Sequence, residues 1–278
     1  MNSTTDGPAD TSVRWRIAPS VPVAIGVTIA YCIVFVGIAA SSGIPYGEWF
    51  ATAPNAWRAA VLPLLGGAVV LVTFLAWARW DGVFRDPGRL AMSAVLWAAT
   101  AIFAGCFLIR LLFVGWDRLT PGLLVTCAAA GVLVGFCEEV LFRGIVLRAL
   151  RNGTRPEAWV VLASSVWFGL FHLTNIINGS PLSGVLPQVA VATVSGAVLY
   201  LFRRGTGILL AGMAAHGLWD FSLFLPAGAT TTASVISLSF TVLVVIVGVS
   251  VLVAVVVRDR RTVMTPAGVR TGPAPAAP

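Results

Sequence analysis

The sequence predicts an all-α, polytopic membrane protein in which about eight transmembrane helices enclose a polar cavity open to the cytoplasm. Of the 278 residues, 58% are apolar and only 10% are charged, a composition typical of integral membrane proteins. Most apolar segments are long enough, at about 1.5 Å per residue, to cross about 30 Å of hydrocarbon. Ionisable side chains interrupt three of these segments, where they are energetically costly, and so indicate a buried polar site.

Each apolar segment is expected to form one membrane-spanning helix, at 21–42, 58–79, 90–114, 121–147, 158–177, 184–202, 206–225 and 233–257. The first three helices fill 21–118, after a cytoplasmic N-terminal segment at 1–20. Residues 119–225 hold the ionisable groups, and 226–261 hold the last helix. The tail at 262–278 is rich in proline, alanine and glycine, and is expected to be disordered in the cytoplasm.

The distribution of arginine predicts the orientation in the membrane. All 18 basic residues are arginines, and fifteen lie at the termini or near one set of alternate loops, whereas the other loops hold only Arg58 and Arg118. Because arginine is enriched on the cytoplasmic side, we expect a multi-pass plasma-membrane protein with both termini in the cytoplasm. The same bias explains the net charge of +7. We therefore expect the lipid bilayer as a partner and expect no binding of nucleic acid.

The fourth segment carries two adjacent glutamates, Glu138 and Glu139. Glu139 and Arg143 are four residues apart and are expected to form an ion pair on one helix face. Glu138, rotated by about 100°, lacks this partner and is freer to exchange protons. Gly131 and Gly135 form a GxxxG pair that allows close approach of another helix. In the alternative interpretation, both glutamates are merely solvated at the cytoplasmic interface, although Glu138 lies about 12 Å inside the predicted boundary.

The fifth and seventh segments carry the two histidines. Phe168 precedes His172 by four residues and is expected to pack against the imidazole, and Asn175 is expected to orient it. His216 and Asp220 share a helix face, so that Asp220 either orients His216 or faces a substrate or metal together with it. A lone histidine in an apolar helix is more often a core residue. Both histidines lie at a depth similar to that of the glutamates, which favours one shared cavity.

Two other residues within the apolar segments, Arg110 and Cys137, are expected to have structural roles and no catalytic role. Arg110 lies near the outer end of the third segment, and its side chain is expected to extend to the membrane interface, with pairing across helices as the alternative. Cys137 adjoins Glu138 but is expected to be an inert, buried thiol.

The ionisable residues resemble, in order and spacing, the three motifs of the CAAX protease and bacteriocin-processing family, also called the Abi family of intramembrane proteases. The motifs are E-E-x-x-x-R, F-x-x-x-H, and H-x-x-x-N or H-x-x-x-D. The residues that resemble them are, in chain order, Glu138, Glu139 and Arg143, then Phe168 and His172, then His216 and Asp220. The resemblance covers residues 120–225. Members closest to the prenyl-protein endopeptidases usually have asparagine at the position of Asp220, so this chain departs from that branch.

The resemblance implies a membrane-embedded peptidase in which Glu138 and His172 activate a water, while His216 and Asp220 stabilise the tetrahedral oxyanion. Elementary chemistry agrees in part, because a carboxylate with a nearby imidazole is a workable general base. His216 can supply a donor to an oxyanion, whereas an ionised Asp220 cannot. Zinc use stays open, since Glu138, His172, His216 and Asp220 offer enough ligands for Zn²⁺ but the chain contains no H-E-x-x-H motif. A metal-free glutamate–histidine pair is equally compatible with these residues.

Three functions compete on the sequence alone. The first is an intramembrane endopeptidase that acts on a lipidated or otherwise membrane-associated peptide or protein. The second is a non-catalytic membrane protein, such as a bacteriocin immunity factor or a scaffold. The third is a proton-coupled carrier, which the absence of visible repeats disfavours. The sequence identifies neither the substrate nor the oligomeric state.

Overall fold

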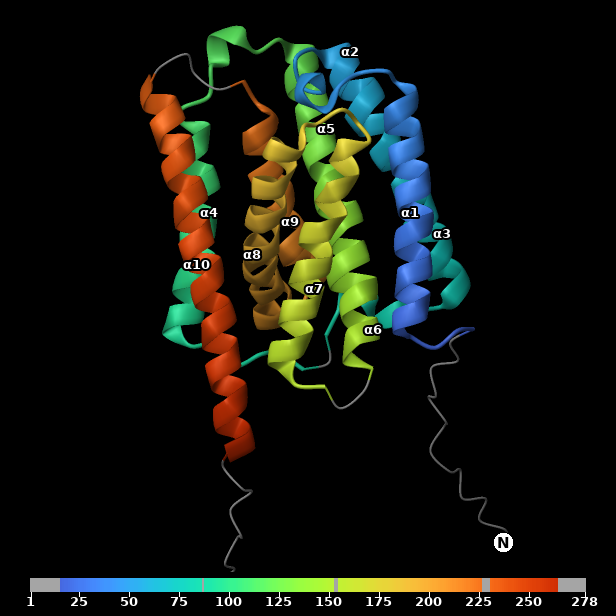
Figure 1. Cartoon of the computed structure of the whole chain (residues 1–278), viewed down its shortest axis with the longest axis vertical. Helices are drawn as coiled ribbons and strands as arrows, with labels where there is room; N and C mark the ends of the chain where they lie inside the picture. Colours follow the sequence, from blue (N-terminus) through green and yellow to red (C-terminus); the bar gives the residue numbers. More distant parts are fainter. Residues whose placement is uncertain (1–15, 87, 153–154, 227–230, 265–278) are drawn as a thin grey trace, which may run out of the picture.

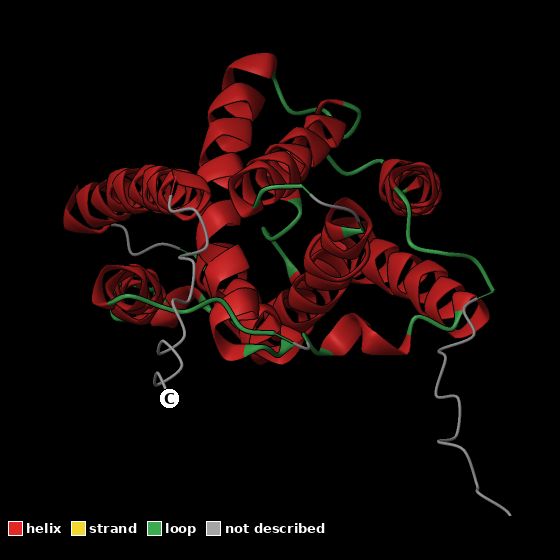
Figure 2. Cartoon of the chain, turned by 90° about the horizontal axis from the view of Figure 1, so that it is seen from below, coloured by secondary structure: helices red, strands yellow, loops and turns green. Residues whose placement is uncertain are grey.

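Helices account for almost all of the chain that the computed structural model describes, which is residues 16–86, 88–152, 155–226 and 231–264. They run in alternating directions in one bundle, and both ends of the described chain lie at the same end of it (Figure 1). Within those residues no strand is present, and a single isolated bridge joins Arg85 to Ile208 (Figure 2). The predicted all-α class is confirmed. The predictions for 1–15 and 265–278 fall outside the described residues.

The α-helices alternate with short turns of other helical types. The α-helices are α1 Val21–Ser41, α2 Ala53–Ala56, α3 Leu62–Ala78, α4 Ala94–Leu111, α5 Pro121–Glu138, α6 Leu147–Arg151, α7 Glu157–Phe171, α8 Leu182–Thr206, α9 Leu209–Phe224 and α10 Thr231–Met264. The 3₁₀ turns are η1 Tyr46–Glu48, η3 Asp81–Phe84, η4 Trp116–Arg118 and η6 His172–Ile176. The π-helical stretches are η2 Trp57–Val61 and η5 Glu139–Val146, and each continues the α-helix that precedes it.

Seven helical stretches of the described chain are long and apolar enough to cross a membrane, namely Val21–Ser41, Ala53–Ala78, Ala94–Leu111, Pro121–Arg151, Glu157–Ile176, Leu182–Thr206 and Ser239–Val257. The sequence predicted about eight. The remaining predicted segment forms α9, whose 16 residues span only about 24 Å. Because α9 packs against α4, α5 and α8, it occupies the expected place in the bundle but is too short to be counted by length.

The long helix Pro121–Arg151 changes from α-helical to π-helical geometry immediately after Glu138. Thr120 caps its start, where the side-chain oxygen accepts a hydrogen bond from the backbone N–H of Leu123. All eight residues of η5 are buried. π-Helical turns are rare and are frequent at functional sites. The transition separates Glu138 from Glu139, so the two side chains leave the helix under different local geometry.

Glycines allow α5 to approach α9 closely. A Cβ added to Gly217 would lie 2.6 Å from the carbonyl oxygen of Gly131, and one added to Gly131 would lie 2.8 Å from the carbonyl oxygen of Gly217. Gly135 likewise faces the backbone of Met213 and Gly217. The close approach predicted from the GxxxG pair is confirmed, and it places the carboxylates of α5 and η5 beside the imidazole on α9.

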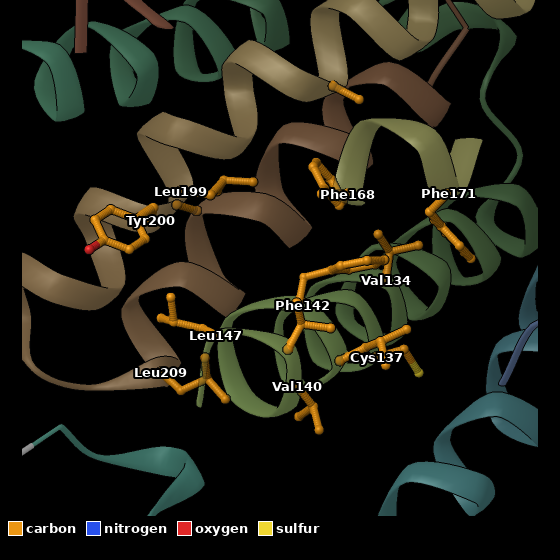
Figure 3. Close-up of a cluster of buried hydrophobic side chains, with 14 of the residues drawn as sticks. Val134, Cys137, Val140, Phe142, Leu147, Phe168, Phe171, Leu199, Tyr200 and Leu209 are labelled. Carbon is orange, nitrogen blue, oxygen red and sulfur yellow. The ribbon is translucent and has the colours of Figure 1, made fainter. Parts of the chain in front are cut away.

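Buried aromatic rings hold α7 against the helix Pro121–Arg151. The ring of Phe142 lies 5.2 Å from that of Phe168 and 5.4 Å from that of Phe171, measured between centroids. Figure 3 shows the three rings within the larger buried cluster, which also contains Val134 and Cys137. Edge-to-face contacts of this kind add to the stabilisation from area burial. Because His172 follows Phe171 directly, this packing also determines where the histidine lies.

Candidate active site

The structure brings the predicted site residues together from three helical elements. Glu138 ends α5 and Glu139 begins η5, while His216 and Asp220 lie one turn apart on α9. His172 lies where α7 passes into the 3₁₀ turn η6. The close packing of α5 on α9 and the aromatic contacts of α7 bring these elements together.

A buried carboxylate joins Arg143 to His216. One oxygen of Glu139, Oε1, lies 2.9 Å from Nη1 of Arg143 and 2.9 Å from Nδ1 of His216. The side chain of Glu139 is fully buried, and that of Arg143 is 3% exposed. The ion pair predicted from the i,i+4 spacing is present. A side chain at Gly212 would collide with this carboxylate, because an added Cβ there would lie 2.8 Å from Oε2 of Glu139.

Arg143 is fixed on two further sides. Its Nη2 atom donates to the carbonyl oxygen of Gly196 on α8 at 3.1 Å. Its guanidinium also lies over the ring of Phe168, 4.2 Å from the centroid. Cation–π contacts are strongest where water is excluded, as it is here. Arg143 therefore links the helix Pro121–Arg151 to α7 and α8, while its charge holds Glu139 against His216.

The second ring nitrogen of His216 lies between two more carboxylates. Nε2 is 3.7 Å from Oε2 of Glu138 and 3.6 Å from Oδ2 of Asp220. Both distances are too long for a hydrogen bond, so Nε2 is available to a substrate oxygen or a water. Oε2 of Glu138 is also buried without a hydrogen-bond partner. The sequence offered Asp220 as the group that orients His216, but Glu139 makes that contact at Nδ1.

His172 is oriented by its own helix. Nδ1 lies 3.0 Å from the carbonyl oxygen of Phe168, and the two rings meet edge to face at 5.1 Å. A carbonyl only accepts, so Nδ1 carries the proton and Nε2 of the neutral ring is an acceptor. The packing of Phe168 on His172 was predicted correctly. The orienting role predicted for Asn175 was wrong, because its amide donates instead to Oε1 of Gln188 at 3.0 Å.

Gln188 and Tyr46 belong to the site and were missed from the sequence. Nε2 of Gln188 donates to the hydroxyl oxygen of Tyr46 at 2.9 Å, so a chain of hydrogen bonds runs from Asn175 to Tyr46. Burial raises the pKa of Tyr46 to about 12, and its hydroxyl therefore stays protonated at neutral pH. Gln188 could have been identified as a polar residue within a predicted apolar helix. Tyr46 lies in a connection between helices, where no sequence pattern distinguishes it.

A cavity of about 480 Å³ lies beside these groups. Glu138, His172 and Asp220 form part of its wall, and it extends to the exposed residues Gly47 and Ala51. These two residues lie in the connection between α1 and α2, at the end of the bundle opposite the termini (Figure 1). His216 lines an adjoining cavity of about 310 Å³, which shares His172 and Asp220 with the first.

The position of the cavity corrects one expectation. The sequence predicted cytoplasmic termini and a cavity open to the cytoplasm, but the structure places the two ends of the described chain at the end of the bundle opposite the cavity mouth. The two expectations are therefore incompatible, and at most one of them is correct. The helix that carries Glu138 continues to Arg151, so this glutamate lies about 20 Å from that end and not about 12 Å.

Arg110 also differs from the expectation. Its side chain does not extend to the interface: the residue is 7% exposed, and its guanidinium lies over the ring of Trp219, 4.9 Å from the centroid. None of its three side-chain nitrogens has a hydrogen-bond partner. Arg110 interacts electrostatically with Asp220 across the helices, as in the alternative considered from the sequence. It therefore brings a positive charge close to the carboxylates of the site.

The residues named as zinc ligands are not arranged as a metal site. In the described part of the chain, no group of three or more His, Cys, Asp or Glu side chains is placed to hold a metal ion. The set proposed from the sequence was Glu138, His172, His216 and Asp220. Glu138, His172 and Asp220 line the first cavity, and His172, His216 and Asp220 line the adjoining one.

Residues 120–222 match the model of a protein family described as type II CAAX prenyl endopeptidase Rce1-like. This region is an Rce1-like domain. The Rce1-like domain extends from α5 almost to the end of α9 and contains every residue predicted to be catalytic. The family predicted from the three motifs is confirmed for this region, and α1–α4 and α10 lie outside it. No curated protein and no solved structure matches the chain.

Proposed function

We propose that the Rce1-like domain is an intramembrane endopeptidase that hydrolyses a peptide bond of a membrane-associated peptide or protein. The family match supports a protease of the CAAX type at the family level. The observation that carries the proposal is the cavity of about 480 Å³ whose wall contains Glu138, His172 and Asp220. His216 lies beside this cavity, and its Nε2 atom forms no hydrogen bond with any of the described residues.

In this proposal Glu138 and His172 activate water. The carboxylate of Glu138, which lines the cavity, accepts one proton of a water held there, and Nε2 of His172 accepts a hydrogen bond from the same water. The water oxygen attacks the peptide carbonyl carbon, and Glu138 then delivers its proton to the leaving amine. Glu138 and His172 line the same cavity, so one water held there can contact both side chains.

His216 stabilises the oxyanion from the other side. Its Nδ1–H donates to Glu139, so Nε2 can donate to the substrate only in the imidazolium form. The carboxylates of Glu138, Glu139 and Asp220 surround this ring and balance its charge. Asp220 then acts through His216, and Arg110 offsets its charge from the far side. A positioned donor of this kind is a large contributor to acyl-transfer catalysis.

The cavity wall favours an apolar substrate segment. Its aromatic residues are Phe35, Tyr46, Trp49, Phe50, Phe171 and Phe224. Apolar walls with a few polar groups are typical of ligand-binding cavities. We therefore propose a lipidated or membrane-spanning peptide as the substrate, whose apolar part lies against these rings while the bond to be cleaved reaches Glu138.

Replacing His172 by alanine tests this function. Hydrolysis of a membrane-anchored fluorogenic peptide in proteoliposomes should fall about 100-fold or more, because the water loses one of its two acceptors. Leu173→Ala is the matched control, since Leu173 is the next residue and is exposed on the bundle surface. If a protective or scaffolding effect in cells survives the combined loss of Glu138, His172 and His216, the non-catalytic interpretation is correct instead.

We further propose that both termini are cytoplasmic, as the arginine distribution indicates, and that the cavity is entered from the opposite side of the membrane. In intact cells, Ala51→Cys should then react with a membrane-impermeant maleimide. Arg155→Cys, an exposed position at the arginine-rich end, should react only after permeabilisation. The reverse labelling pattern would place the cavity mouth in the cytoplasm.

A further inference from the structure

A second polar cavity lies at the arginine-rich end of the bundle, away from the candidate active site. Its volume is about 320 Å³, and it is enclosed by η3, η5, α6 and the end of α8. Its polar wall consists of Asp86, Arg143, Arg148, Arg151, Asn152 and Arg203. Neither the sequence motifs nor the proposed peptidase chemistry assigns a function to this cavity.

In the described ion pairs around this cavity, arginines outnumber carboxylates. Asp86 is shared by three arginines: Oδ1 lies 3.2 Å from Arg203 and 3.9 Å from Arg151, and Oδ2 lies 2.9 Å from Arg204. Glu157 contacts Arg151 and Arg204, at 3.7 Å and 3.0 Å, and both of these arginines also contact Asp86. In these ion pairs three arginines share two carboxylates, so that positive charge exceeds negative charge by one.

Two hydrogen-bond donors of the Arg203 side chain have no acceptor among the described residues. The residue is only 2% exposed, yet Nε and Nη1 have no hydrogen-bond partner, while Nη2 contacts Asp86. Leaving buried donors of a charged group unpaired is destabilising. A guanidinium presents its donors as a planar fork that fits two oxygens of a phosphate. The wall therefore supplies both the charge and the hydrogen-bonding geometry that a phosphate group requires.

We propose that this cavity binds a phosphate group, carried either by an anionic lipid or by a free phosphate. Basic pockets between transmembrane helices on the cytoplasmic side are suited to lipid head groups, and this end is the one that the arginine distribution assigns to the cytoplasm. The site would be linked to the Rce1-like chemistry through Arg143. This residue lines the cavity and also contacts Glu139, which in turn contacts His216.

Thermal unfolding of the full-length protein in nanodiscs tests the proposal in two arms. The first adds inorganic phosphate to phosphatidylcholine discs, with chloride at matched ionic strength as the reference. The second compares phosphatidylglycerol with phosphatidylcholine discs in phosphate-free buffer. Stabilisation in the first arm identifies a free phosphate, and stabilisation in the second identifies a lipid head group. The absence of stabilisation in both arms overturns the proposal.

Three variants test whether this cavity is the site of phosphate binding. Arg203→Gln should weaken binding about tenfold or more, because it removes a charge-assisted pair of hydrogen bonds. Arg148→Gln provides a second test that leaves the Arg203–Asp86 pair intact. Arg155→Gln is the control, since Arg155 lies at the same end but stacks on Trp159, 4.4 Å from the ring centroid and outside the cavity. Equal weakening by all three variants would indicate general surface charge and overturn the proposal.

Discussion

Replacing Glu138 by glutamine is expected to slow peptide hydrolysis by about 100- to 10,000-fold, the usual contribution of a general base. The amide keeps the size of the side chain but cannot accept a proton from water. Oε2 of Glu138 is buried and has no hydrogen-bond partner among the described residues, and it lies 3.7 Å from Nε2 of His216. The variant should therefore keep its fold, its level in the membrane and its midpoint of thermal unfolding.

The measurement is the initial rate of cleavage of a membrane-anchored peptide by purified protein in proteoliposomes. Glu48→Gln is the matched control, because Glu48 is exposed in η1 near the cavity mouth and has no proposed part in the chemistry. The inactive Glu138→Gln protein can also retain bound substrates for identification by mass spectrometry. Full activity of this variant, with an unchanged fold, would contradict the assignment of Glu138 as the base.

Removing Arg143 is expected to have the largest effect on stability. Arg143→Leu leaves the fully buried carboxylate of Glu139 without its counter-charge, and breaking one side of a buried ion pair costs about 3–5 kcal/mol. The variant also loses the contact with the carbonyl oxygen of Gly196 and the stacking on Phe168. The free energy of unfolding in detergent should fall accordingly, and Arg118→Leu, at an exposed position, should change it little.

The double variant Glu139→Leu, Arg143→Leu separates stability from function. Replacing both partners of a buried pair by apolar residues is often neutral or stabilising, so most of the lost stability should return. Activity should stay low, because Nδ1 of His216 no longer has a carboxylate to orient it. A double variant that is both stable and fully active would show that Glu139 and Arg143 serve the fold alone.

Interactions within one helix could be predicted from the sequence, because helical geometry fixes which residues face each other. The ion pair of Glu139 with Arg143 and the packing of Phe168 on His172 both follow from a spacing of four residues. The close approach of α5 to α9 followed from small residues at the same spacing.

Interactions between helices could not be predicted in the same way. Arg110 was expected at the interface, since its own helix gives no hint that Trp219 and Asp220 lie beside it. The link from Gln188 to Tyr46 joins residues 142 positions apart. The side on which the cavity opens depended on where the helix of Glu138 ends, and helix ends are the least certain part of any sequence-based prediction.

The placement of Arg143 has a consequence for the permeability of the membrane. The two cavities enter the bundle from opposite ends, and Glu138 lines one while Arg143 lines the other. Water admitted from both sides would form a conducting path unless something closed it. A buried guanidinium is a strong electrostatic barrier to protons and cations. Arg143, held by Glu139, Gly196 and Phe168, is therefore expected to block the passage of protons and cations between the two cavities.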